Sequence, residues 1–174
     1  IYLGQLYDSK INLHILGYDE SGWSNQNNYY GGRLAHSSNT PDGASGSADC
    51  RIDASNNGNL FLGVCMEAVD DHRPEHSVLC YGRDNIWLGS RFEQPGPLEF
   101  AAGGDFNAVL FGFGNFGQDS TATSGELEIV DGGTGNVILG GYGINLTANS
   151  STYGPEAAVN LAAGGSDAFA HLIA

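Results

Sequence analysis

Short apolar runs separated by polar, glycine-rich turns constrain the fold of this chain more than any other feature. Glycine accounts for 27 of the 174 residues, whereas helix formers such as lysine and methionine are scarce. The runs are rich in β-branched and aromatic residues, which fit a pleated, half-buried surface better than a helix. The pattern therefore predicts an all-β fold without a persuasive helix.

About ten of these runs follow one another at regular spacing, and we expect each to form a short strand. The clearest runs are residues 11–15, 49–55, 59–65, 85–92 and 107–113. Asn57 and Gly58 are the favoured pair for a tight primed turn, which predicts a hairpin around them. With no clean internal repeat, the sequence predicts a single domain over residues 1–174, folded as an antiparallel β-barrel or β-sandwich.

The chain is strongly acidic. Twenty acidic residues against six basic ones give a formal net charge of −14. Such a surface cannot neutralise phosphates, so we expect no nucleic acid partner, and adhesion to an anionic membrane is disfavoured for the same reason. No apolar run approaches the length of a membrane-spanning helix. The acidity has two explanations, solubility in an acidic medium or cation binding.

Two features predict a secreted, extracellular glycoprotein. The chain starts at Ile1 without a basic and apolar leader, as a mature secreted protein does, although a shortened chain would look the same. Two acceptor sequons for N-linked glycans begin at Asn145 and Asn149, close together in a segment typical of a turn.

The three cysteines, Cys50, Cys65 and Cys80, follow one another at intervals of fifteen residues. In a secreted chain they suggest one disulfide and one spare thiol, which is either buried or forms an intermolecular bridge. The predicted hairpin places Cys50 opposite Cys65 at a hydrogen-bonded pair. Disulfides between adjacent strands fit the more closely spaced non-hydrogen-bonded pairs better, which argues against a Cys50–Cys65 bridge.

The densest cluster of ionisable side chains lies between the last two cysteines and includes Asp70, Asp71, His72 and His76. Imidazoles suit transition metals and carboxylates suit Ca²⁺, so these four residues are a candidate metal site. Pro74 prevents the helix that would place both imidazoles on one face. A solvated hairpin tip and a catalytic acid/base pair are the alternatives, and we predict no resident cofactor.

A candidate ligand site lies in a loop rich in asparagine, glutamine and glycine, which contains Trp23, Tyr29 and Tyr30. Aromatic rings stack on the apolar faces of sugars and planar ligands while amides bind hydroxyl groups. The alternative is that these rings only anchor the loop to the barrel.

No residue is assigned as catalytic. Glu126 and Glu128 share one face of a strand, but the carboxylates of a glycoside hydrolase usually face each other across a cleft. The sequence contains no serine elbow, no zinc-protease motif and no phosphate-binding loop.

One family resemblance covers about residues 51–92. Here an Asn-Gly turn precedes a strand ending in Cys65, an Asp71-His72 loop, Cys80 and an aromatic strand. This arrangement resembles the secreted fungal β-barrel family typified by the major Alternaria allergen. The resemblance implies a Cys65–Cys80 disulfide, which leaves Cys50 as the free or intermolecular thiol. It also implies a non-enzymatic protein that binds small phenolic ligands or plant defence proteins, in some cases as a dimer.

The sequence thus predicts a non-catalytic extracellular binding protein for a small planar ligand or a host-protein partner. Two alternatives stay open. One is a protein that binds glycans or acts on them through acidic and aromatic residues, with a glycoside hydrolase-like activity if it is an enzyme. The other is a structural protein that forms a homodimer or a larger assembly.

Overall fold

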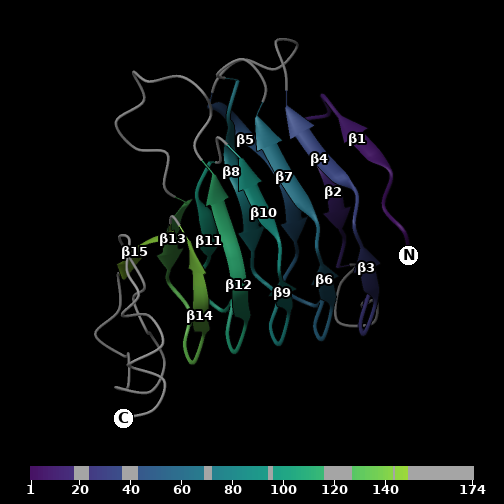
Figure 1. Cartoon of the computed structure of the whole chain (residues 1–174). Coiled ribbons are helices and arrows are strands. Elements are labelled where there is room, and N and C mark those ends of the chain that lie inside the picture. The colour runs from purple at the N-terminus through teal and green to yellow at the C-terminus, as the bar shows by residue number, and fades with distance from the viewer. Residues whose placement is uncertain are drawn as a thin grey trace.

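The computed structural model describes residues 1–17, 24–36, 43–68, 72–93, 96–115, 127–142 and 144–148 and folds them as a β-solenoid. The chain winds through about four turns, and successive turns lie side by side in chain order (Figure 1). Every strand pair in these ranges is parallel, and none of these residues is helical. The all-β prediction is therefore confirmed, whereas the antiparallel barrel or sandwich is wrong.

Two parallel sheets form the walls of the solenoid, and the first sheet bends into two arms. Its first arm contains β3 (Asn28–Tyr30), β6 (Leu60–Leu62), β9 (Ile86–Leu88) and the first residues of β12 (Ala108–Asn115) and β14 (Val137–Tyr142). Its second arm contains β1 (Gln5–Tyr7), β4 (Arg33–His36), β7 (Cys65–Ala68), β10 (Arg91–Glu93) and the end of β12. The second sheet contains β2 (Ile11–Ile15), β5 (Ala44–Ile52), β8 (Pro74–Cys80), β11 (Leu98–Phe100), β13 (Leu127–Asp131) and β15 (Ile144–Ala148).

The bend between the two arms depends on one backbone position in each turn. Gly31, Gly63 and Gly89 occupy it with φ angles of 56°, 62° and 60°, a conformation that residues with a Cβ rarely adopt. Phe111 takes the same place in the next turn at a φ of 53°. Each turn therefore passes from the first arm to the second through a left-handed residue.

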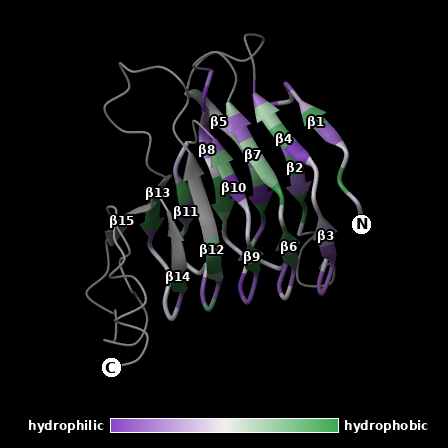
Figure 2. Ribbon diagram, viewed as in Figure 1, coloured by the Kyte–Doolittle hydropathy of each residue, from purple (hydrophilic) through white to green (hydrophobic). Residues whose placement is uncertain are grey.

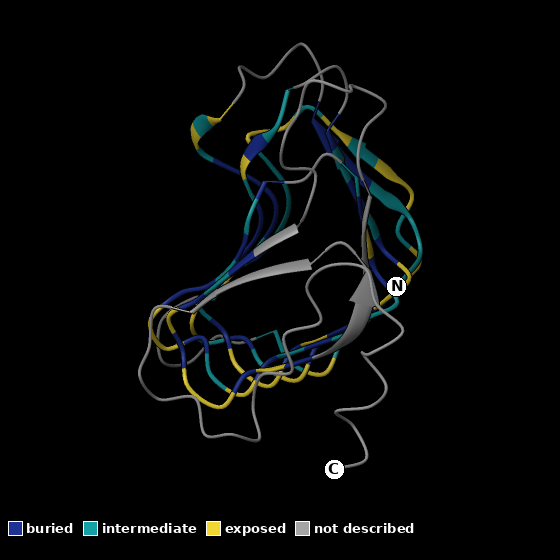
Figure 3. Ribbon diagram, turned by 60° about the vertical axis from the view of Figure 1, so that its left-hand side comes forward, coloured by how far each residue is buried: buried dark blue, intermediate teal, exposed yellow. Residues whose placement is uncertain are grey.

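The core is a set of stacks that run along the solenoid axis. The central residues of β3, β6 and β9 stack as rings, with centroids 4.9 Å apart for Tyr29 and Phe61 and 5.1 Å apart for Phe61 and Trp87. Val109 and Ile138 continue this stack in the following turns. Buried and more exposed residues alternate along β6, β7, β9, β10 and β11 (Figure 3), because successive side chains point to opposite sides of a strand.

A column of asparagines, buried except for the half-buried Asn27 and here called the asparagine ladder, marks the corner before the first arm. Its members are Asn27, Asn59, Asn85, Asn107 and Asn136. The Nδ2 atoms of the first three donate to the Oδ1 of the next member at 3.1, 2.9 and 3.1 Å. Each Oδ1 after the first also accepts the backbone N–H of the preceding member, at 2.7–3.1 Å. Every turn is thus hydrogen-bonded to the next at this corner.

The ladder reveals a repeat that the sequence analysis missed. Asn59-Leu-Phe-Leu-Gly63 and Asn85-Ile-Trp-Leu-Gly89 occupy equivalent places in successive turns, and Asn27-Asn-Tyr-Tyr-Gly31 precedes them. The ladder members lie 32, 26, 22 and 29 residues apart, so no fixed period exposes the repeat.

The hairpin predicted around Asn57 and Gly58 does not form. β5 and β6, the strands on either side, belong to different sheets, and these two residues lie at a corner of the solenoid. Asn59 instead enters the ladder and turns the chain into a new parallel turn. Cys50 consequently does not lie opposite Cys65.

Candidate ligand-binding site

The disulfide prediction is wrong, because all three cysteines are free. Cys65 lies in β7 of the first sheet, whereas Cys50 and Cys80 lie in β5 and β8 of the second sheet. Cys50 and Cys80 are completely buried in the core. Burial raises the pKa of the Cys50 thiol well above its usual range and that of Cys80 to about 12, so both thiols stay protonated.

Half of the predicted metal cluster falls outside the described residues, namely Asp70 and Asp71. His72 is partly buried, and His76 lies in β8, where its Nε2 is 2.8 Å from Oε2 of Glu99 on the neighbouring β11. His76 thus has a partner across the sheet, and the metal site stays a prediction.

The structure does not unite the predicted aromatic platform. Trp23 lies outside the described residues. Tyr29 is only 5% exposed and packs into the core, whereas Tyr30 lies on the outer side with its ring centroid 5.3 Å from that of Tyr2. Neighbouring residues of a strand point to opposite sides, so Tyr29 and Tyr30 cannot share one binding surface.

Asn145 lies in β15 and pairs with Glu128 of β13, so the first sequon occupies a strand and not a turn. Asn149 and Glu126 lie outside the described residues. The use of these sequons stays a prediction.

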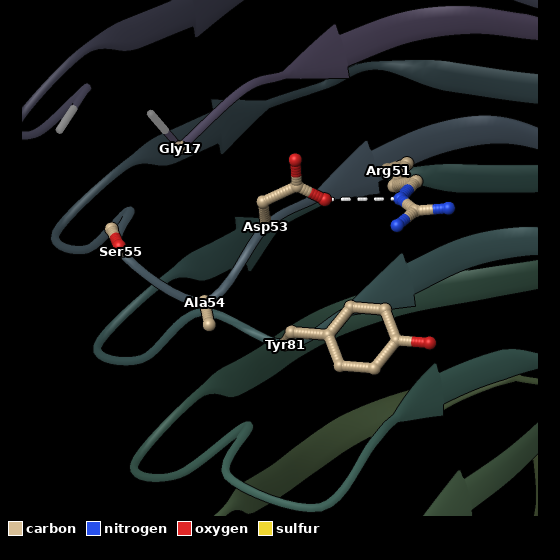
Figure 4. A pocket seen from close by; sticks show the side chains of 6 residues that line it. All are labelled: Gly17, Arg51, Asp53, Ala54, Ser55 and Tyr81. Carbon is tan, nitrogen blue, oxygen red and sulfur yellow. Dashed lines mark hydrogen bonds and ion pairs between the residues drawn. The ribbon is translucent and has the colours of Figure 1, made fainter. Parts of the chain in front are cut away.

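An open pocket of about 330 Å³ lies beside the end of β5 (Figure 4). Its lining consists of Gly17, Arg51, Asp53, Ala54, Ser55 and Tyr81. Cys50 and Ile52 point into the core, so the alternation of the strand turns Arg51 outward. Asp53 comes directly after Ile52, the last residue of β5, where the chain leaves the sheet.

A charged network is built around Asp53. Arg51 donates from Nε to Asp53 Oδ1 at 3.0 Å, and Nε2 of His14 lies 3.1 Å from Asp53 Oδ2. Burial alone would raise the pKa of Asp53, but the hydrogen bonds from Arg51 and His14 outweigh it and hold that pKa below its usual value. Asp53 is therefore ionised at neutral pH.

Tyr81 supplies the aromatic wall of the pocket. The guanidinium carbon of Arg51 lies 5.6 Å from the centroid of its ring, within the range of a cation–π contact. Figure 4 shows the guanidinium group extending beyond Asp53 on the same side as the Tyr81 ring. A ring, a guanidinium and a carboxylate therefore border one open space.

Gly17 lies close to Ser55 in the pocket lining. A Cβ at this position would come within 3.1 Å of the Ser55 Cβ, which is closer than ordinary packing allows. The volume lies at the lower end of the range of about 300–1,000 Å³ found for small-molecule sites.

Sequence reasoning did not find this pocket, because its residues converge only in the parallel register. Ile52 pairs with Cys80, and the N–H of Tyr81 donates to the carbonyl of Ile52 at 2.9 Å. This pairing brings Tyr81 next to Asp53 from about thirty residues away. The only local signal was the charged pair Arg51 and Asp53 flanking a core residue.

A second polar cluster lies on the outer side of the second arm. Ligand atoms of Cys65, Glu67 and Glu93 lie within 4.8 Å of one another. Glu67 is hydrogen-bonded to Arg33, and Arg91 lies 2.5 Å from Glu93, so both carboxylates already have cationic partners. Burial raises the pKa of the Cys65 thiol to about 11, and the thiol is protonated at neutral pH. These residues therefore form an ion-pair network, not a site prepared for a metal.

Comparison with known proteins leaves the assignment to the geometry, since no protein-family model, no curated protein and no solved structure matches the chain. No described residue belongs to a helix long and apolar enough to cross a membrane.

Proposed function

We propose that this protein is a non-catalytic binding protein, acts outside the cell, and holds a sugar or a similar hydroxylated ligand in the pocket beside β5. The observation that carries the proposal is the convergence of Arg51, Asp53 and Tyr81 around one open space. A ring stacks on the apolar face of a sugar, while a guanidinium and a carboxylate bind its hydroxyl groups. The two sequons support the extracellular location.

The pocket suits a hydroxylated ligand better than a planar apolar one. A planar phenolic ligand gains most of its affinity from enclosure between apolar walls. Here Tyr81 is the only aromatic residue of the lining, and the side chains of Arg51, Asp53 and Ser55 are polar. Binding therefore depends on hydrogen bonds around a single ring.

The charge network argues against catalysis at this pocket. Glycoside hydrolysis requires two carboxyl groups, one of which is usually protonated. Asp53 is the only carboxylate in the lining, and its lowered pKa makes it a poor proton donor. Arg51 and His14 also occupy both of its oxygens.

A glycan array followed by calorimetry with the best ligand tests the proposal. Arg51→Met keeps an unbranched aliphatic side chain but removes the guanidinium that contacts Tyr81, and we expect it to lower affinity at least tenfold. Tyr81→Ala should have an effect of similar size. Binding of no glycan by the wild type, or unchanged binding by Arg51→Met, would overturn the proposal.

Arg83→Met is the matched control. The Arg83 guanidinium lies 5.1 Å from the Phe106 ring centroid and 3.5 Å from the Asp84 carboxylate, so it repeats the local arrangement away from the pocket lining. We expect glycan affinity to be unchanged in this variant. A loss equal to that in Arg51→Met would mean that a general loss of positive charge is responsible.

A further inference from the structure

The outer side of the first arm is a flat apolar surface, here called the apolar face. Its residues are Tyr30, Leu60, Leu62, Ile86, Leu88, Ala108, Leu110 and Val137. Phe61 and Trp87 between them point into the core, so the alternation of each strand turns its flanking residues outward. Figure 2 shows β6 and β9 coloured as hydrophobic.

These side chains are accessible to solvent. Leu62, Ile86 and Val137 are 38%, 36% and 38% exposed. At one end Tyr2, 87% exposed, extends the face by packing against Tyr30. Monomeric proteins expose single apolar residues routinely, but an ordered apolar array over successive strands indicates a contact surface.

The apolar face carries no charged residue, and the neighbouring Asn28 of β3 is exposed and polar. The outer sides of the other walls differ. Arg33, Glu67 and Arg91 lie outside the second arm, and Arg51 lies outside the second sheet. Among the described residues, Tyr7, Leu16, Phe106 and Phe111 are also exposed, but they lie outside the continuous array of outward apolar side chains on the first arm.

The size of the apolar face limits the complex that it can support. Four strand spacings of about 4.8 Å separate β3 from β14, and outward residues on one strand lie about 7 Å apart. With their side chains they cover a patch of roughly 25 by 12 Å. Stable complexes bury about 1,200 Å² or more in total, so two such patches support only weak, reversible association.

The chemistry of the face selects its partner. A charged or strongly polar surface placed on it would lose water without gaining hydrogen bonds. The complement must be flat, apolar and uncharged, and the same face of a second copy has these properties together with an identical strand spacing. We propose that two copies of this chain associate face to face about a two-fold axis through their apolar faces.

Net charge gives this association a distinctive salt dependence. Each copy carries a formal charge of −14, so two copies repel at low ionic strength although their contact surfaces are uncharged. Salt screens that repulsion and leaves the apolar contact intact. Added salt should therefore strengthen the dimer, whereas it would weaken an interface built on opposite charges.

Sedimentation equilibrium of the full chain from about 10 µM to about 1 mM tests the proposal at about 50 and 500 mM NaCl. We expect the mean mass to rise toward that of a dimer with protein concentration, and to rise further at the higher salt. A monomer throughout this range at both salt concentrations would overturn the proposal.

Variants locate the contact. The double variant Leu62→Thr/Leu88→Thr introduces β-branched side chains that fit a strand and removes apolar contact area, and it should weaken association at least tenfold. Arg91→Thr on the second arm is the control and should associate as the wild type does at about 500 mM NaCl, where salt screens the repulsion added by the lost positive charge. Undiminished association of the folded double variant, or binding of monomers to neutral phosphatidylcholine vesicles in place of dimerisation, would overturn the proposal.

Discussion

Two polar stacks run along the first sheet, one buried and one exposed. The asparagine ladder is uncharged, and Asn59, Asn85 and Asn107 are no more than 1% exposed. The other stack, here called the charged strip, consists of Arg33, Glu67, Arg91 and Glu93, with side chains between 18% and 49% exposed. Water can replace a lost partner in the strip but cannot reach the ladder, so the two stacks should differ widely in their contribution to stability.

The ladder also favours parallel pairing between successive turns. Each inner member offers one Oδ1 to two N–H groups of the preceding turn, one from the backbone and one from the side chain. This geometry is satisfied only when equivalent residues of successive turns lie side by side, as in parallel strands. The charged strip imposes no such condition, because long ionic side chains can pair over several registers.

Asn85→Ala should show the largest effect. It removes the Oδ1 that accepts from the backbone N–H and Nδ2 of Asn59, and it leaves both donors buried. At about 1–3 kcal/mol for each unsatisfied group, we expect a loss of roughly 2–5 kcal/mol in the free energy of unfolding. Urea denaturation followed by circular dichroism measures it.

Asn57→Ala controls for the loss of an asparagine at the same corner. The Asn57 side chain is half-buried and bonds to no described residue, so this variant should cost less than about 0.5 kcal/mol. Equal losses in the two variants would show that the ladder bonds are not the cause.

The core also contains a buried pair that can ionise, unlike the uncharged asparagine ladder, so its contribution to stability depends on pH. His36 Nδ1 lies 2.8 Å from Asp49 Oδ1, and both side chains are completely buried. Burial raises the pKa of Asp49 to about 6 despite the hydrogen bond from His36. Burial alone would lower the pKa of His36, but the hydrogen bond and charge of Asp49 outweigh it and raise that pKa.

Both shifts make stability fall as pH rises. The folded state binds more protons than the unfolded chain above about pH 4, where unfolded aspartate titrates. The contribution of Asp49 is complete below that pH and is lost as pH rises through about 6, and that of His36 is lost above its unfolded pKa of about 6.5. We expect roughly 2–3 kcal/mol less stability at pH 7 than at pH 4 from Asp49.

Asp49→Asn tests this slope through urea denaturation at a series of pH values. The difference between wild type and variant should decline between pH 4 and pH 7. Asp53→Asn is the control of opposite sign, because the pKa of Asp53 is lowered and its contribution is lost only as pH falls below about 4. A pH-independent difference for Asp49→Asn would contradict the prediction.

Strand positions could be predicted from the sequence, but their pairing could not. Residues 11–15 form β2 as expected, and the run 85–92 contains β9 and most of β10. A wall with one buried side alternates in the same way whether its strands are parallel or antiparallel. Asn57 and Gly58 fit a solenoid corner as well as a hairpin, so the local signals favoured the commoner antiparallel arrangement.

The pocket could not be predicted from the sequence for the same reason. The sequence shows Arg51 and Asp53 as a local pair, but Tyr81 joins them only through the register that pairs Ile52 with Cys80. A Cys65–Cys80 disulfide was predicted from the sequence, but parallel winding places Cys65 and Cys80 in different sheets. Long-range register, not local pattern, decides both outcomes.

Arg91→Ala should show the smallest effect of the series. Its partner Glu93 is 25% exposed and Arg91 itself 49%, so water solvates each charge when the other is removed. We expect a loss below about 0.5 kcal/mol, and less at high salt, in the same urea assay. A loss near that of Asn85→Ala would mean that the charged strip also holds successive turns in register. The small expected value places the specification of this fold in its buried amides and leaves the exposed charges free to vary.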